Sequence, residues 1–461
     1  MKEIKMESTI EQPLTIEKPK LSPEISRRLE ARFGNNIFSF TDLVNFSSYD
    51  EVVGFYSGRN AAIKLFGSGD KPLVYSAIDG HSAFMDKIKE LHKDNPDAYK
   101  TPVEIHSPYY AIGVAREIEA LLEIGNIEPI IYEIGAGKAT LAKDMLDYWK
   151  KYNPELYQKI KYRILDASPK LISEQKGRLD EHKGRVEWTE ADARNIPFGD
   201  KSVEGVLVNT ELLDNLPTAC IKRTKQTSGK QVNLDDFAEV GYQLKDGQLI
   251  EIEMSLSDTV KAYIAENPGL LLLESNTLAP TMNIQVGKRG YIGVGVRDFY
   301  KEIARVFKRG YVISFDYCSL PTEDKGNYME MSVHRGEKEL GLLENIGQAD
   351  IYFSVDCWAA NHMATSYGFE NVQFSLPEGQ LFRWVFESEG KEAEHEYRQL
   401  LFKNDKYGPP PLIADFSNTF ALVHSIGLGS YPKNLHDKLR EITHRHQTQQ
   451  EDLTLGRNAQ G

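Results

Sequence analysis

Residues 130–139, with the sequence IIYEIGAGKA, decide the fold of this chain. An apolar run interrupted only by Glu133 leads into two closely spaced glycines, Gly135 and Gly137. Apolar residues then recur at helical spacing from Leu141 onward. The pattern predicts a buried strand, a glycine turn and a helix, a context in which a ligand can approach the backbone and the first helical amides. A short glycine motif taken alone is weak evidence, and an ordinary tight turn is the alternative.

The same alternation continues after the turn. Residues 162–165, 186–188 and 203–208 are typical of further buried strands, separated by helical segments. A second alternation predicts a helix at 299–307, a strand at 311–315, a helix at 358–367 and a late strand at 382–386. Strands that alternate with helices indicate a parallel sheet with right-handed crossovers, an α/β fold of the Rossmann-like type.

Acidic residues follow three successive strands of this predicted sheet. Glu133 precedes the glycine turn, Asp166 ends the second strand, and Asp192 follows the third. An acid at the turn would repel a pyrophosphate but can hold the cationic methionyl end of S-adenosylmethionine (SAM), while Asp166 suits two ribose hydroxyls. The sequence therefore predicts a SAM site. Its expected cofactor-binding residues are Glu133, Gly135, Gly137, Asp166, Ala167, Asp192 and Ala193.

The fourth strand leads into a second acidic segment, residues 209–217. Ligands of open parallel sheets bind beyond the carboxyl ends of the strands, so this segment should face the transferred methyl group. Glu211 and Asp214 are the candidate catalytic residues, which would orient the acceptor or take up a proton. In the alternative interpretation Asp214 only caps the following turn and Glu211 alone faces the pocket.

The remaining segments divide the chain into six parts. Turn residues Asp246 and Gly247 separate two apolar runs and predict a β-hairpin within an insertion, and Ser22 followed by Pro23 predicts a helix start. We expect a disordered tail at 1–21, an N-terminal cap at 22–102, a SAM-binding core at 103–217, an insertion with a hairpin and a helix at 218–295, the rest of the core at 296–435, and a tail at 436–461.

The composition of the chain makes some classes of binding partner unfavourable. The formal net charge of -13 over 461 residues makes nucleic acid or an anionic membrane surface unfavourable partners. Three cysteines, Cys220, Cys318 and Cys357, form no closely spaced metal or redox motif, and no long apolar segment or signal core is evident. These features predict a cytoplasmic protein without a metal site, and they leave the oligomeric state open.

Several ordered motifs together resemble the MidA-like family of SAM-dependent methyltransferases. The resemblance extends from about Ser22 to Phe386, and each motif alone is modest whereas their order is specific. The motifs lie at 37–40, 54–56, 107–109, 133–137, 166–169, 211–217, 315–317, 350–356 and 378–382. This resemblance implies a class I methyltransferase fold with a mostly parallel seven-stranded sheet, an N-terminal cap and a β-rich insertion.

The resemblance also implies an acceptor. Mitochondrial relatives in that family methylate an arginine of a partner subunit as complex I assembly factors, so a guanidinium nitrogen held by Glu211, or by Glu211 and Asp214 together, is expected. Asp316 and Tyr317 are further candidate substrate residues, as are His106 and Tyr109. Two alternatives remain, namely a small-molecule O- or N-methyltransferase of specialised metabolism and a non-catalytic SAM-binding assembly factor.

Overall fold

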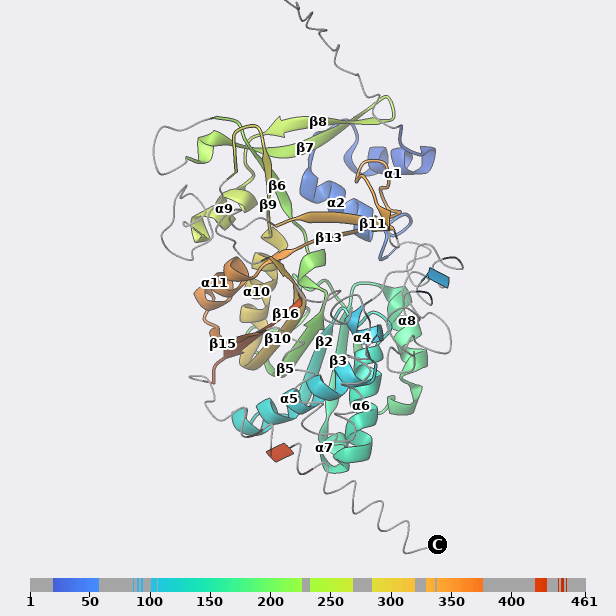
Figure 1. Ribbon diagram of the computed structural model, residues 1–461, viewed down its shortest axis with the longest axis vertical. Coiled ribbons are helices and arrows are strands. Elements are labelled where there is room, and N and C mark those ends of the chain that lie inside the picture. The colour runs from blue at the N-terminus through green and yellow to red at the C-terminus, as the bar shows by residue number, and fades with distance from the viewer. Residues whose placement is uncertain are drawn as a thin grey trace, which may run out of the picture.

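A central sheet and a separate cap make up the described part of the chain (Figure 1). This computed structural model describes residues 20–57, 86, 89–90, 93, 101–105, 107–225, 233–267, 284–319, 329–335, 338–375, 419–428, 438, 441–442 and 445. The central sheet lies in the lower half of Figure 1, and the cap lies above it.

Within the described residues, the central sheet follows the strand order β15-β16-β10-β5-β2-β3-β4, and β14 pairs with the end of β10. Strands β4, β3, β2, β5 and β10 are parallel, whereas β16 is antiparallel to both β10 and β15. This confirms the predicted α/β fold with a mostly parallel seven-stranded sheet. The strands are β2 (Ile130–Ile134), β3 (Lys161–Asp166), β4 (Val186–Glu190), β5 (Val203–Thr210), β10 (Phe307–Ser319), β14 (Val355–Asp356), β15 (Glu370–Ser375) and β16 (Thr419–Ile426).

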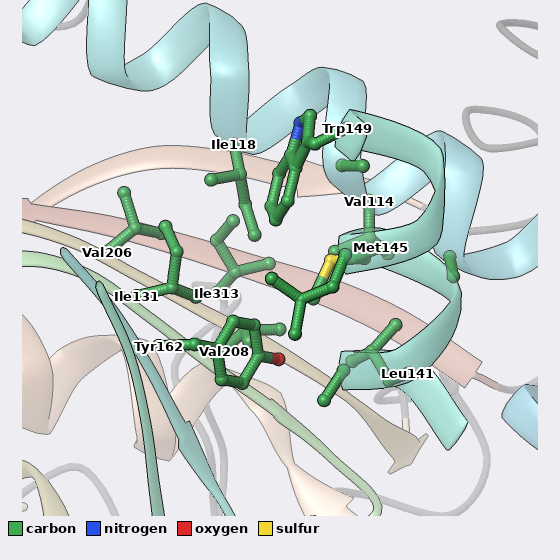
Figure 2. Packing of buried hydrophobic residues seen from close by; sticks show 14 of the residues in the cluster. Val114, Ile118, Ile131, Leu141, Met145, Trp149, Tyr162, Val206, Val208 and Ile313 are labelled. Carbon is green, nitrogen blue, oxygen red and sulfur yellow. The ribbon is translucent and has the colours of Figure 1, made fainter. Parts of the chain in front are cut away.

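Helices cover both faces of the sheet because successive side chains of a strand point to opposite faces. Ile131 packs on one face with Val114 of α5 and Trp149 of α6 (Figure 2), whereas Tyr132 packs on the other face with Phe299 of α10. The helices of the core are α4 (Pro102–Ile105), α5 (Tyr109–Gly125), α6 (Thr140–Tyr152), α7 (Pro154–Lys159), α8 (Pro169–Arg178), α10 (Val294–Val306) and α11 (Cys357–Ser366), with a 3-10 turn η3 (Asp180–His182).

The cap is built from the described residues of three segments, 20–57, 218–293 and 329–353. Strand β1 from the first segment pairs with β7 of the second, in a sheet ordered β1-β7-β6-β9 with β8 on the other edge of β7. The third segment adds the small sheet β12-β11-β13. The elements are α1 (Pro23–Phe33), β1 (Phe38–Ser39), α2 (Phe40–Tyr49), β6 (Ala219–Arg223), η5 (Leu234–Asp236), β7 (Phe237–Lys245), β8 (Gln248–Met254), α9 (Asp258–Glu266), β9 (Arg289–Ile292), β11 (Met331–Arg335), β12 (Lys338–Glu339) and β13 (Asp350–Phe353).

Aromatic residues from all three segments meet in the core of the cap. The ring centroid of Phe40 lies 6.1 Å from that of Phe353 and 5.7 Å from that of Tyr291. Residues 329–353 therefore belong to the cap, although the sequence analysis placed the whole of 296–435 in the methyltransferase core. Short strands separated by polar turns gave no signal for this placement.

Local turn and cap signals match the structure where they can be compared. The Ser22 side chain accepts a hydrogen bond from the Ile25 amide at the start of α1, and Asp246 and Gly247 both have positive φ between β7 and β8. The strand predicted at 382–386 lies outside the described residues. No helix in the described ranges is long and apolar enough to cross a membrane.

The expected tail at 436–461 contains ordered residues. Residues 438, 441, 442 and 445 are helical. Ile442 is buried in the core, and Arg445 donates a hydrogen bond to Glu123 at 2.7 Å. Cys318 and Cys357 form a disulfide with a Cα–Cα distance of 5.8 Å, while Cys220 is free and buried. The parallel pairing of β10 with β14 brings these two cysteines together. Their spacing along the chain gave no sign of this contact.

Candidate functional site

A cavity of about 370 Å³ lies where the carboxyl ends of the central strands face the cap. Its volume falls within the range of small-molecule and cofactor sites. One wall comes from the loops that follow β2, β3, β4 and β5, and the other comes from the cap. The cap residues on the wall are Arg32, Asn45, Tyr49, Tyr56 and Ser57.

The glycine turn forms part of the first wall. Gly135 and Gly137 line the cavity, and their φ values of 72° and 53° lie in the left-handed region that favours glycine. A Cβ on Gly135 would also lie 3.3 Å from the Leu212 side chain. The turn therefore keeps the backbone accessible at the start of α6, as a cofactor with a charged end requires.

Asp166 ends β3 on the same wall, beside Ala167. Its Oδ1 accepts a hydrogen bond from the Ser168 amide at 2.9 Å, and its Oδ2 accepts one from Gln175 at 2.9 Å. Burial raises the pKa of this carboxyl to about 6. A carboxylate has roughly four acceptor positions, so Asp166 keeps capacity for the two hydroxyls of a ribose. The residues present thus fit an adenosine-containing cofactor.

Asp192 and Ala193 continue the wall after β4. Arg194 donates two hydrogen bonds to the Asp192 carboxylate, from Nε at 2.9 Å and from Nη2 at 2.6 Å. The sequence analysis did not single out Arg194. Burial alone would raise the pKa of Asp192. The hydrogen bonds and the charge of Arg194 outweigh burial, so the pKa of Asp192 lies below its usual value. An acid followed two residues later by an arginine at a strand end was the available signal for this pair.

Glu133 does not reach the cavity wall formed by the described residues. Its side chain is buried and accepts a hydrogen bond from Tyr162 at 2.6 Å. Burial, the largest influence, raises the pKa of Glu133 to about 8. This hydrogen bond joins Glu133 of β2 to β3, and the direct cofactor contact expected from the sequence stays a prediction.

Glu211 lines the cavity in a backbone conformation that is rare outside glycine, with φ at 49°. Its amide donates to the Phe315 carbonyl at 2.8 Å, and Tyr317 hydrogen-bonds to its carboxylate. The other carboxylate oxygen, Oε1, is buried without a partner. Burial first, and then the charges of Asp316 and Asp350, hold the pKa of Glu211 well above its usual range.

Asp214 and Asp316 lie behind this part of the wall. Asp316 is buried and accepts hydrogen bonds from the amides of Leu213 at 2.7 Å and Asp214 at 3.3 Å. It thereby fixes the 3-10 turn η4 (Leu213–Asn215), a supporting role that differs from the expected contact with substrate. Asp214 is buried as well. Of Glu211, Asp214 and Asp316, only Glu211 lines the cavity.

Tyr49, Tyr56 and Asn215 complete this end of the cavity, and sequence reasoning assigned none of them a role. The Tyr49 hydroxyl donates to the Asn215 carbonyl at 3.0 Å, so the cap is bonded to the loop after β5. His106 lies outside the described residues. Tyr109 begins α5, but its side chain also lies outside them.

Comparisons with known proteins bear on the family and the fold of the chain. Residues 114–375, more than half of the chain, match the family described as "Putative S-adenosyl-L-methionine-dependent methyltransferase". Comparison with curated proteins finds no match.

Two solved structures from Burkholderia thailandensis share the fold. One is a "likely methyl transferase" bound to S-adenosyl-homocysteine, with a TM-score of 0.62 and 16% identity. The other is a native crystal structure from the same superfamily, with a TM-score of 0.60 and 16% identity. Each likeness covers 90% of this chain and 96% of the other. On the family match, this chain is a member of the family of SAM-dependent methyltransferases, and SAM is its cofactor.

Proposed function

We propose that this methyltransferase acts on a positively charged nitrogen compound, with the guanidinium of an arginine as the leading acceptor. The observation that carries the proposal is the buried Oε1 atom of Glu211, which has no partner and belongs to a residue of the cavity wall. A guanidinium offers N–H donors in a planar array that such a carboxylate can accept. The resemblance to the MidA-like family supports the same acceptor.

The cavity would divide into two halves. In the cofactor half, Gly135 and Gly137 would leave room for the methionyl end of SAM, and Asp166 would accept from the ribose hydroxyls. Ala167, Asp192 and Ala193 would border the adenine. SAM supplies the methyl group on a sulfonium that is already electrophilic, so the protein mainly positions the two reactants.

In the acceptor half, Glu211 would orient the nitrogen. The acidic groups that interact with Glu211 through their charges are Asp214, Asp316 and Asp350. This concentration of acidic groups favours a cationic ligand over a neutral one. When the nitrogen–methyl bond forms and the sulfur–methyl bond breaks, the acceptor loses one proton. The nearby carboxylates can take it up before it passes to solvent.

The test is methylation of an arginine-containing peptide pool and of arginine amide by the purified protein with SAM. Hydrolysis and mass spectrometry then identify the methylated atom. We expect methylarginine from the wild type and a loss of about 100-fold or more in Glu211→Gln, because a bound guanidinium favours the ionised form of Glu211 and glutamine cannot ionise. Asp258→Asn, an exposed change at the start of α9, is the matched control.

Methylation of an oxygen, or unchanged turnover by Glu211→Gln, would contradict the proposal. Two aromatic residues of the cap, Tyr49 and Tyr56, line the cavity and also suit a small acceptor. Amines and phenols therefore belong in the same assay as competitors. Unaltered SAM in every reaction would favour a binding protein without catalysis.

A further inference from the structure

A second cavity, of about 660 Å³, lies beside the cofactor cavity in the cap. Its described lining comes from α1, between Glu24 and Arg32, and from residues 49–52 at the end of α2. Two residues, Arg32 and Tyr49, line both cavities, so the two cavities adjoin. We call the second cavity the α1 groove.

The cofactor cavity leaves little room for an acceptor larger than one side chain. Its volume of about 370 Å³ lies near the lower end of the range for pockets that enclose a single ligand. SAM, the cofactor of this family, must occupy most of that volume. A polypeptide that carries a target arginine therefore needs further space, and the α1 groove supplies it next to the cofactor cavity.

An ion pair holds the α1 groove in shape. Arg28 donates to both carboxylate oxygens of Asp50, at 2.7 and 2.9 Å, and to Glu51 at 3.2 Å. Oδ1 of Asp50 also accepts hydrogen bonds from the amides of Val52 and Val53, at 3.0 Å each. These bonds fix α1 against the turn that follows α2, so a ligand meets a groove that is already formed.

Arg32 differs from the other arginines of the two cavities in its partners. Arg28 pairs with acids, and Arg194 in the cofactor cavity pairs with Asp192. Within the described residues Arg32 forms no ion pair, and its guanidinium lies 5.4 Å from the ring centroid of Phe33. A guanidinium has five N–H donors and stays charged at any working pH, so Arg32 has donors left for an anionic ligand.

The remaining charged residues of the α1 groove lie farther from the cofactor. Nε of Arg27 donates to the Pro23 carbonyl at 3.2 Å. Glu24 lies in the first turn of α1, where a negative charge stabilises the helix. Both line the α1 groove but not the cofactor cavity. Among the described charged residues of α1, Arg32 alone is shared by the two cavities.

We propose that the α1 groove binds the polypeptide around a target arginine, and that Arg32 recognises an acidic residue close to that arginine. Arg32 and Glu211 line the same cavity, so a guanidinium held by Glu211 brings its neighbours in the peptide toward Arg32. A carboxylate accepts two parallel N–H bonds from a guanidinium. Arg32 determines specificity and takes no part in methyl transfer. The inference rests on the proposed function and names the class of its substrate.

Calorimetry with matched peptides, in protein saturated with S-adenosyl-homocysteine, tests this recognition. Each peptide has blocked ends and a central arginine, and aspartate is placed in turn at the two positions on either side. The partner peptide has asparagine at the same position. We expect the wild type to prefer aspartate by about threefold or more at one of these positions, as for a favourable exposed ion pair. In Arg32→Gln the ratio should fall to about one, with little change for the asparagine peptide.

Lys245→Gln is the matched control. Lys245 is exposed at the end of β7 and lines neither cavity, and its replacement removes the same charge from the cap. This variant should keep the preference for aspartate. Arg32→Gln should also bind S-adenosyl-homocysteine as the wild type does. A marked loss of that affinity would show that Arg32 holds the carboxylate of the cofactor, and would overturn the proposal.

Other results would also contradict the proposal. Equal affinity for aspartate and asparagine peptides at every position, or a preference that survives in Arg32→Gln, would exclude recognition by Arg32. Free arginine that binds as tightly as the best peptide would assign Arg32 to the carboxylate of a small acceptor. Absence of peptide binding would exclude the groove. If the peptides bind with an Arg32-dependent preference but no methylarginine forms, the proposed function fails and the recognition stands.

Discussion

Glu211 shows how single residues shape this site. Its positive φ is a conformation that carries about 1–3 kcal/mol of strain in a residue other than glycine. The Phe315 carbonyl accepts from its amide, and Asn215 donates to its carbonyl oxygen, so the surrounding chain enforces this conformation. The strain is maintained where it directs a carboxylate into the cavity, which is the usual location of such residues in enzymes.

Glu133→Gln separates a supporting role of this residue from a direct role in cofactor binding. Because the pKa of Glu133 is raised to about 8, the acid is mostly neutral at pH 7, and glutamine resembles that form. We expect the affinity for S-adenosyl-homocysteine at pH 7, measured by calorimetry, to change by less than about threefold, or under 1 kcal/mol. A loss of about 100-fold would show that the charge of Glu133 contacts the cofactor.

The same variant has a defined pH signature. The raised pKa stabilises the folded wild type below about pH 4, where the unfolded chain is also protonated, and this contribution is lost as the pH rises through about 8. Glu133→Gln lacks this loss. Its stability relative to the wild type should therefore increase between pH 5 and 9 in denaturant titrations.

The sequence predicted some of the residues that line the cavity. Gly135, Asp166 and Glu211 could be found because each follows a predictable buried strand, and strand ends of a parallel sheet meet at one edge. Tyr56 and Arg194 could not, since their roles depend on hydrogen bonds formed only in the folded chain; the partner of Tyr56, Asn215, lies 159 residues away. The support that Asp316 gives to η4 was hidden for the same reason.

At the level of elements, the cap depends on contacts between segments far apart in sequence. Core strands such as β2 were predictable with their bounds, because a continuous apolar run beside a glycine turn has few other interpretations. β11 and β13 are short and partly exposed, and they become stable only when they pack on α2 and β9. Their membership of the cap was therefore invisible in the local pattern.

Phe353→Ala tests whether the three cap segments form one cooperative unit. Phe353 is fully buried on β13 and meets Phe40 and Tyr291 from the other two segments. Removing its ring should lower the free energy of unfolding by about 3–5 kcal/mol. Chemical denaturation followed by circular dichroism measures the change. Ile37→Ala is the control, because Ile37 is 47% exposed and its replacement should have an effect within about 0.5 kcal/mol. Equal effects of the two changes would refute a shared cap core.

At the level of the whole molecule, the net charge of -13 should favour a cationic acceptor. Raising the salt concentration from about 0.02 to 0.3 M shortens the range of this attraction from roughly 20 Å to under 10 Å. We expect KM for an arginine-containing acceptor to rise several-fold over this range, with kcat little changed. Steady-state kinetics with a neutral acceptor analogue is the control. Salt-independent KM values would argue against a cationic acceptor.

The cofactor and acceptor halves of the cavity are tested together by calorimetric titration with S-adenosyl-homocysteine. The wild type, Asp166→Ala and Glu211→Gln are compared, and thermal melting first verifies that each protein is folded. We expect micromolar binding by the wild type, a loss of about 10- to 100-fold in Asp166→Ala from a missing charged hydrogen bond, and nearly unchanged binding by Glu211→Gln. Full affinity in Asp166→Ala, or an equal loss in Glu211→Gln, would contradict this division of the cavity.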